Sequence, residues 1–240
     1  MGVNKVKDLK IKIYSDGADA EEIIRLDTEN FVDGFTTNPT LMKTSGITDY
    51  LAFAKEVLSA VKEKSISFEV FSDELDDMYR QANILRDLGE NVWVKIPVSN
   101  TKGEYTYPLI QKLSNEGVKL NITAIFTKEQ IKQVYSSLNP SVNSIISIFA
   151  GRIANAGIDP EETMQYATDL VSGDENIETL WASSREVFNI IQAERCGTDI
   201  ITLTPGLIKG MKDLGKNLDQ YSLETVKMFY EDAQESGFTL

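Results

Sequence analysis

A lysine stands inside an apolar run that is otherwise typical of a buried strand. The run is Val92-Trp93-Val94-Lys95-Ile96-Pro97-Val98. Lysine is rarely buried unless its charge is paired or lost, because removing an ammonium ion from water costs several kcal/mol. Burial favours the neutral amine, which attacks carbonyl carbon. The run therefore predicts a nucleophilic Lys95. The alternative is a lysine near a strand end, marked by Pro97, that reaches solvent or pairs with a carboxylate.

The composition excludes several classes of catalysis. The 240-residue chain has no histidine, which excludes Ser-His-Asp and Cys-His catalysis and histidine-ligated zinc. Acid–base steps must then use Asp, Glu, Lys or Tyr. The single cysteine, Cys196, allows no intrachain disulfide, so we expect a reducing, cytoplasmic location. Before Gly197, Cys196 is better explained as a small apolar residue than as a reactive thiol.

The net charge limits the partners. A formal charge of −13 disfavours nucleic acid and anionic membranes, and any site for an anionic substrate must concentrate positive charge locally. No stretch reaches the ~18 apolar residues of a membrane span, and the first residues lack an apolar signal segment. Two acidic clusters, 72–77 and 159–162, have the pattern of helix starts, an interpretation we favour over divalent-metal sites.

Strand-like and helix-like segments alternate along the chain. Apolar, β-branched runs predict eight strands, at Ile11–Ser15, Val32–Thr37, Ile66–Phe71, Val92–Val98, Val118–Ile125, Asn143–Ala150, Glu178–Ser183 and Asp199–Thr204. The stretches between them are amphipathic with helical spacing. Eight β/α units in a chain of this length, with no linker, predict an α/β fold with one (β/α)8 TIM barrel domain over residues 1–240. A leftover amphipathic segment, 223–237, predicts an extra C-terminal helix that caps the barrel or reaches a neighbouring subunit.

Function in such barrels collects at the C-terminal ends of the strands. The first seven predicted strands each deliver polar groups there: Asp16, Thr36 with Asn38, Glu69, Lys95, Asn121 with Thr123, Ser147 followed by Arg152, and Ser183 with Arg185. Two of only six arginines fall on adjacent strand ends, as a phosphate site in an acidic protein would require. Taken singly, these residues could serve turns, backbone hydrogen bonds or surface ion pairs. Their coincidence at one end of the barrel favours a site.

Five segments at these strand ends form a specific combination. They are Gly34-Phe35-Thr36-Thr37-Asn38-Pro39-Thr40-Leu41, Val94-Lys95-Ile96-Pro97, Asn121-Ile122-Thr123, Ser147-Ile148-Phe149-Ala150-Gly151-Arg152 and Ala182-Ser183-Ser184-Arg185. In their order and spacing the chain resembles the transaldolase family of class I, Schiff-base-forming aldolases. The resemblance covers nearly the whole predicted barrel. The chain length is similar to that of the family's shorter members, which include fructose 6-phosphate aldolases.

The resemblance implies a role for each residue of the predicted site. Lys95 would form an imine with the C2 carbonyl of a ketose phosphate, and Asp16 would be the general base for C3–C4 cleavage. Glu69 and Thr123 would move, through a water, the protons of imine formation. The residues implied to hold the dihydroxyacetone unit and the catalytic water are Thr36, Asn38, Asn121 and Ser147, and those implied to bind phosphate are Arg152, Ser183 and Arg185. No metal or cofactor is implied, because the iminium ion itself withdraws the electrons.

Transaldolases and the related aldolases differ in the fate of the enamine that cleavage leaves on the lysine. By resemblance, Glu69, Asn121 and Phe149 are of the transaldolase type; the aldolases carry an amide in place of Glu69 and a tyrosine in place of Phe149. We therefore predict a transaldolase of sugar-phosphate metabolism, such as the pentose phosphate pathway. It would move dihydroxyacetone from sedoheptulose 7-phosphate or fructose 6-phosphate to an aldose phosphate.

Two alternatives to this prediction stay open. An aldolase on the same scaffold is the nearer one. A non-catalytic sugar-phosphate-binding barrel is the weaker one, because a binding protein needs no buried amine. Ser184 departs from the family pattern, in which an aromatic residue commonly stands between the serine and the arginine of the phosphate segment. Short family members often form rings, so we expect a homo-oligomer.

Overall fold

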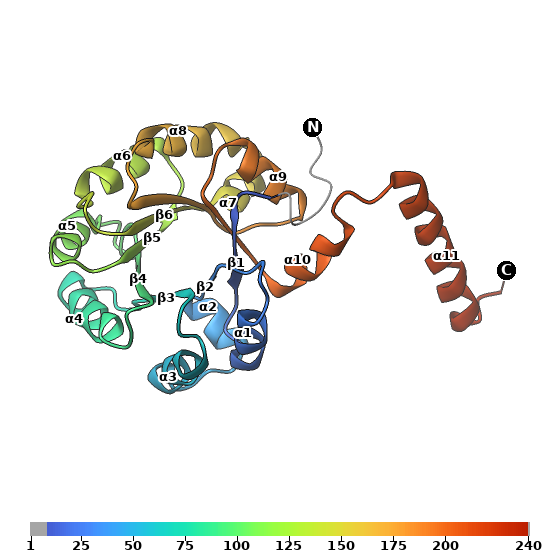
Figure 1. Cartoon of the computed structure of the whole chain (residues 1–240), viewed down its shortest axis with the longest axis horizontal. Coiled ribbons are helices and arrows are strands. Elements are labelled where there is room, and N and C mark those ends of the chain that lie inside the picture. Colours follow the sequence, from blue (N-terminus) through green and yellow to red (C-terminus); the bar gives the residue numbers. More distant parts are fainter. Residues whose placement is uncertain (1–8, 240) are drawn as a thin grey trace.

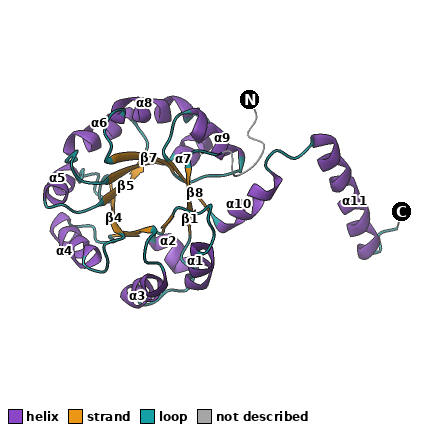
Figure 2. Cartoon of the chain, viewed as in Figure 1, coloured by secondary structure: helices purple, strands orange, loops and turns teal. Residues whose placement is uncertain are grey.

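The protein is a closed barrel of eight parallel strands in the order β1 to β8, surrounded by helices (Figure 1). The computed structural model describes residues 9–239; residues 1–8 and 240 of the predicted domain lie outside this range. The predicted (β/α)8 barrel is confirmed. Figure 2 shows the strands forming the inner wall and the helices the outer ring.

Each predicted strand has an observed counterpart. The strands are β1 (Lys12–Asp16), β2 (Gly34–Thr36), β3 (Ser65–Glu69), β4 (Val92–Pro97), β5 (Leu120–Ile125), β6 (Ser144–Ile148), β7 (Ile177–Trp181) and β8 (Ile200–Leu203). Most are shorter than predicted. Residues just beyond the strand ends, such as Val70 and Val98, still donate one backbone hydrogen bond to the neighbouring strand but do not continue the regular ladder. β8 pairs with β1 and closes the barrel.

The helices follow the strands in a regular alternation. They are α1 (Ala20–Asp27), α2 (Pro39–Thr44), α3 (Tyr50–Ala60), α4 (Leu75–Arg86), α5 (Tyr107–Asn115), α6 (Lys128–Ser137), α7 (Ala150–Asn155), α8 (Glu161–Val171), α9 (Phe188–Arg195), α10 (Pro205–Gly210) and α11 (Leu218–Ser236). The two acidic clusters lie at the starts of α4 and α8, as predicted, and Pro160 directly precedes the first residue of α8.

Two short helices, α2 and α7, were not predicted as separate elements. The Asn38 side chain accepts a hydrogen bond from the Leu41 amide and Pro39 opens the first turn, so α2 starts directly behind β2. α7 follows β6 in the same way, after Phe149. With six residues each, neither is long enough to show a clear helical repeat in the sequence.

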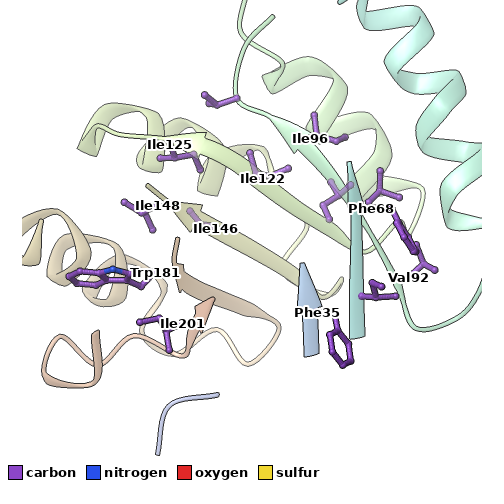
Figure 3. Close-up of a cluster of buried hydrophobic side chains, with 14 of the residues drawn as sticks. Phe35, Phe68, Val92, Ile96, Ile122, Ile125, Ile146, Ile148, Trp181 and Ile201 are labelled. Atoms are coloured by element: carbon purple, nitrogen blue, oxygen red, sulfur yellow. The ribbon is translucent and has the colours of Figure 1, made fainter. Parts of the chain in front are cut away.

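Alternation along the strands divides the apolar side chains between two layers. One face points outward and packs under the helices; Figure 3 draws part of this layer, with Phe35, Phe68, Ile122 and Trp181 among the labelled side chains. The inward face carries a smaller cluster: Tyr14, Trp93, Ile145, Leu180, Ala182 and Ile200. Most of this inner cluster fills the barrel below the polar strand ends, and its members Leu180 and Ala182 reach the wall of the cavity there.

The last helix, α11, stands away from the barrel (Figure 1). It begins at Leu218, not at Leu223 as predicted, because the Asn217 side chain caps it by accepting from the Gln220 amide. Within residues 9–239 none of its side chains is buried. Ahead of it, Lys216 Nζ lies 3.2 Å from Asp213 and 2.5 Å from Glu224 Oε2, which ties the start of α11 to the segment that follows α10.

Candidate active site

A cavity of about 390 Å³ opens at the C-terminal ends of the strands, a volume within the usual range for small-molecule sites. The predicted site residues that line it are Asp16, Thr36, Asn38, Glu69, Lys95, Thr123, Ser147, Phe149, Arg152 and Ser183. Asn121 and Arg185 do not line it. Seven strands thus bring polar groups to one space, as the barrel geometry predicts.

Lys95 lies in the floor of this cavity with 6 % of its surface exposed. It does not snorkel to bulk solvent. Its Nζ lies 3.3 Å from Glu69 Oε2 and donates to the Thr37 carbonyl at 3.1 Å. Glu69 and Lys95 are direct neighbours in the β3–β4 register, which fixes the pair. Burial raises the pKa of Glu69 above its usual value, with the Asp16 charge adding to the rise and Lys95 opposing it.

Asp16 stands at the end of β1, on the same cavity. Its Oδ1 accepts a hydrogen bond from Thr36 Oγ1 at 2.8 Å. Burial raises the pKa of this carboxyl, while Lys95 and the Thr36 hydroxyl partly counter the rise. A carboxylate with a raised pKa, held beside a buried amine, is suited to accept a proton from a bound hydroxyl and return it.

Thr123 has a side-chain hydroxyl without a hydrogen-bond partner among the described residues. Its Oγ1 is buried. The β5–β6 register shifts between Ile122 and Ile125, and Ala124, inside that irregularity, has φ 59°. Such bulges commonly re-aim side chains beside active sites. An unpaired buried hydroxyl on a cavity wall favours a water or a substrate oxygen as its partner.

Asn121 lies on the inner face of β5 without lining the cavity and is fully buried. Its amide nitrogen donates to Ser67 Oγ at 3.0 Å, and its carbonyl oxygen accepts from Ser147 Oγ at 2.7 Å. Since both ends of the amide are engaged, Asn121 acts on the cavity through Ser147, which lines it. These two bonds hold the Asn121 amide in place, and its second N–H and second oxygen lone pair are not used by them.

Two side chains on the cavity wall border the entrance. Asn38 uses its amide oxygen to cap α2, which leaves its amide nitrogen for a ligand. Phe149, directly after β6, packs its ring 5.7 Å from that of Phe126, and the Arg152 guanidinium lies 5.6 Å from its centre. This stack holds the Phe149 ring against the cavity and orients Arg152 by a cation–π contact.

The predicted phosphate residues form a looser group. Ser183 lines the cavity with φ 65°, a left-handed conformation that costs energy for a serine. A Cβ on Gly151 would lie 1.7 Å from the Ser183 carbonyl oxygen, so only glycine permits this approach of α7 to the loop after β7. Arg152 and Arg185 are both exposed.

The structure adds two residues that the sequence reading missed. Asn155 of α7 lies beside Arg185: with its amide oxygen toward the guanidinium it accepts from Nε at 3.2 Å and Nη2 at 3.3 Å, and its nitrogen donates to Gly151. Thr202 of β8 lines the cavity and pairs with Thr36. The signal for Thr202 was present, since it is a polar residue between Ile201 and Leu203. Nothing in the sequence indicated Asn155.

Comparison with known proteins identifies the family. The model of the family described as transaldolase/fructose-6-phosphate aldolase matches residues 13–240. The chain belongs to this family. A curated relative from Bartonella tribocorum named "Probable transaldolase" is 31% identical over 203 residues, which cover 84% of this chain and 88% of the relative. Relatives with the same name from Nitrosopumilus maritimus and Paracoccus denitrificans are 30% and 31% identical, and cover 84% and 90% of this chain and 87% and 97% of their own.

The fold also occurs among solved structures that are distant in sequence. The crystal structure titled "putative isomerase from Sinorhizobium meliloti, open loop conformation" superposes with a TM-score of 0.60 at 8% identity. The match covers 85% of this chain and 54% of that one. At this identity the likeness concerns the barrel alone. Across residues 9–239, no helix has the length and apolar composition required to cross a bilayer.

Proposed function

We propose that this member of the family is a transaldolase that moves a dihydroxyacetone unit between sugar phosphates through an imine on Lys95. The observation that carries the proposal is the pairing of a buried amine with two carboxyls in one cavity. Lys95 Nζ is 3.3 Å from Glu69 Oε2, and the charge of Lys95 also acts on Asp16. Desolvated carboxyls with raised pKa values are typical of proton-transfer sites.

The reaction would begin at the ketose carbonyl. The Lys95 amine attacks C2, and the carbonyl oxygen takes up a proton to give a carbinolamine. Loss of its hydroxyl as water then leaves an iminium ion. Hydroxide is a poor leaving group unless it is protonated, and Glu69, with its raised pKa, is suited to supply that proton. The unpaired Thr123 hydroxyl would hold the water through which this proton moves.

Cleavage and transfer would then depend on Asp16. Its carboxylate takes the proton of the C4 hydroxyl, the C3–C4 bond breaks, and the bonding electrons flow to the iminium ion to form an enamine. The aldose product leaves, an acceptor aldehyde enters, and the enamine carbon attacks it. Asp16 returns its proton to the new alkoxide, and water releases the ketose from Lys95. The iminium ion is the electron sink, so these steps use no metal or cofactor.

The remaining residues would position the sugar. Thr36, Asn38 and Ser147 line the cavity around Lys95 and present polar groups to the three-carbon unit, and Asn121 holds the Ser147 hydroxyl in place. Arg152, Ser183 and Arg185 would bind the phosphate at the far end. A charge-assisted phosphate site on the rim fits a protein whose net charge is −13.

The rival function within the family is simple aldol cleavage. An aldolase protonates the enamine and releases dihydroxyacetone, whereas a transaldolase keeps it for an aldehyde. Phe149, held by Phe126 and Arg152 at the cavity edge, offers no exchangeable proton there. This favours transfer.

A coupled assay tests the proposal directly. With fructose 6-phosphate alone, we expect little release of glyceraldehyde 3-phosphate or dihydroxyacetone; with erythrose 4-phosphate added, we expect rapid turnover that survives EDTA. Borohydride with fructose 6-phosphate should add a reduced three-carbon unit to the Lys95 peptide and to no other lysine. Equal cleavage with and without acceptor would replace transaldolase by aldolase. The absence of any adduct under turnover would remove the imine mechanism.

We also propose that the chain assembles with copies of itself through α11. On a helical projection, Leu218, Val226, Phe229 and Tyr230 share one broad face of α11 with Leu223, and Phe229 and Tyr230 are 63% and 65% exposed. The ion pairs of Lys216 with Asp213 and Glu224 hold this face away from the barrel of the same chain. Val226→Glu should reduce the mass in analytical ultracentrifugation, and Glu235→Lys, on the opposite face, should not. A monomeric parent would overturn the proposal.

The proposed location is the cytoplasm. Cys196 is free and buried, and burial raises the pKa of its thiol to about 11. Such a thiol is unreactive and fits a reducing compartment. Fractionation of cells that express the protein tests this, and recovery outside the cytoplasm would contradict it.

A further inference from the structure

Three strands meet at the general-base position of the cavity. Asp16 ends β1, and the two strands that pair with β1 each contribute a threonine: Thr36 from β2 and Thr202 from β8. Thr36 and Thr202 are 3% and 5% exposed. Their hydroxyl oxygens lie 2.6 Å apart, and Thr36 Oγ1 lies 2.8 Å from Asp16 Oδ1. The three side chains therefore form a continuous chain of polar groups that runs from the partly buried Asp16 to two buried threonines.

The number of available protons determines which of the three groups donates each hydrogen bond. Each threonine hydroxyl carries one proton and two acceptor lone pairs. Because the carboxylate can only accept, the Thr36 proton must point to Asp16. The Thr36–Thr202 bond can then form only if Thr202 is the donor. A hydroxyl that receives a hydrogen bond becomes a stronger donor itself, so Thr202 strengthens the bond from Thr36 to the carboxylate.

We infer that Thr202 is a positioning residue for the general base, which it holds in its charged form and in place through Thr36. This rests on the proposed function, in which Asp16 accepts the substrate proton. Thr202 is itself held in place, because its backbone carbonyl accepts from Ser184 Oγ at 2.9 Å and its strand is paired on both sides. Its contribution is separate from imine formation, which uses Lys95, Glu69 and Thr123.

Other charges around Asp16 stay constant when Thr202 is changed. The groups that face Asp16 are Lys95 and Glu69 across the cavity, Arg152 on its far wall, and Asp19 and Glu22 at the start of α1, which line a neighbouring groove. The segment on the β8 side of that groove, Thr204 and Pro205, carries no charge. A shift in the pH profile after a change at Thr202 would therefore report the lost hydroxyl.

Thr202→Val tests the inference, because it removes the hydroxyl and keeps the shape. Without its donor, Thr36 stabilises the carboxylate less, and more of Asp16 is protonated at a given pH. We expect the acidic limb of the kcat–pH profile for transfer to move up by about 0.3–1 pH unit, a two- to tenfold change in the proton equilibrium. KM and the rate of borohydride trapping at Lys95 should change less than twofold. Thr202→Ser should restore the parent profile.

Thr198→Val is the matched control. Thr198 is buried just before β8, and its hydroxyl has no partner within the described residues, so its loss should leave the pH profile unchanged. If Thr202→Val does not fold, Thr202→Ala, which only removes volume, should show the same upward shift. An equal fall in kcat at every pH, or an unchanged limb, overturns the inference while Lys95 is still trapped. Failure of trapping in the parent enzyme would instead overturn the proposed function.

Discussion

Lys95 and Glu69 form an ion pair that is buried on adjacent strands, with 3.3 Å between Nζ and Oε2 and side-chain exposures of 7% and 15%. Each side chain of the pair is the counter-charge of the other, at a position that is largely shielded from bulk water. It also fixes the amine at the point where Thr123 and Asp16 face the same cavity. Breaking the pair should therefore affect both stability and the proton steps of imine formation.

Glu69→Gln removes the acid of the pair but keeps its shape. We expect kcat for transfer to fall by about 10²–10⁴-fold, the usual contribution of a general acid or base. Slow trapping at Lys95 should persist, because the amine is still present. A fall in kcat with no change in the rate of trapping would contradict this role for Glu69.

A double-mutant cycle measures the coupling within the same pair. Glu69→Gln leaves the Lys95 ammonium without its closest counter-charge, so thermal stability should fall. In Glu69→Gln/Lys95→Met no such charge is left, and part of the lost stability should return. If the stability losses of Glu69→Gln and Lys95→Met simply add up in the double variant, the ion pair contributes nothing to folding.

Asp16→Asn separates stability from activity. Burial raises the pKa of Asp16, so the folded state binds its proton more tightly than the unfolded state does. The stability that this proton contributes is then lost as the pH rises from the pKa of the unfolded state to the pKa of the folded state. Above the folded-state pKa the loss is complete. Asn, which has no charge, should raise the melting temperature at pH 7–8, with a difference that shrinks toward pH 4. Transfer should nearly vanish while Lys95 remains trappable. If Asp16→Asn melts at a lower temperature than the parent at pH 8, the expected direction of the stability change is wrong.

The barrel and most of the site could be predicted because they depend on short-range pattern. Period-two alternation places Glu69 and Lys95 on the inner face of their strands, and parallel pairing brings all C-terminal ends to one rim. Backbone detail could not be predicted. Ser183 adopts a left-handed φ of 65°, where the close approach of Gly151 in α7 is distant in sequence, and this conformation determines where the segment proposed to bind phosphate lies.

Two further differences have equally specific causes. Asn121, which the resemblance implies for holding the dihydroxyacetone unit and the catalytic water, does not line the cavity and bonds to Ser67 and Ser147. Thr202 was not among the predicted residues, although alternation in β8 puts it on the inner face. Hydrogen-bond partners of this kind are set by tertiary contacts, which one-dimensional spacing does not specify.

Arg185→Ala should act on phosphorylated substrates only. Losing a charge-assisted bond of about 1.5–3 kcal/mol predicts a roughly 10- to 150-fold fall in kcat/KM for erythrose 4-phosphate. Unphosphorylated glyceraldehyde should change little. Asn155→Ala, which frees the guanidinium from its partner on α7, should give a smaller loss in the same direction. Arg86→Ala, on α4 beside Asp87, is the control. Equal losses with both acceptors would make Arg185 structural.

Phe149→Tyr tests why the enamine should react with an aldehyde before it is protonated. The ring lies on the cavity edge against Phe126 and below the Arg152 guanidinium. A hydroxyl on this ring can hold a water or bond a carboxylate, and either promotes protonation of the enamine. The variant should release free dihydroxyacetone from fructose 6-phosphate faster than the parent, while transfer to erythrose 4-phosphate falls.

Phe126→Tyr is the matched control for this change. Its ring is adjacent to Phe149 but does not line the cavity, so its new hydroxyl should alter neither rate. Both variants retain the aromatic stack and should melt within a few degrees of the parent. Dihydroxyacetone release is measured by coupled reduction, and transfer by sedoheptulose 7-phosphate formation. If the parent already cleaves fructose 6-phosphate as fast as it transfers, Phe149 does not protect the enamine, and the protein acts as an aldolase.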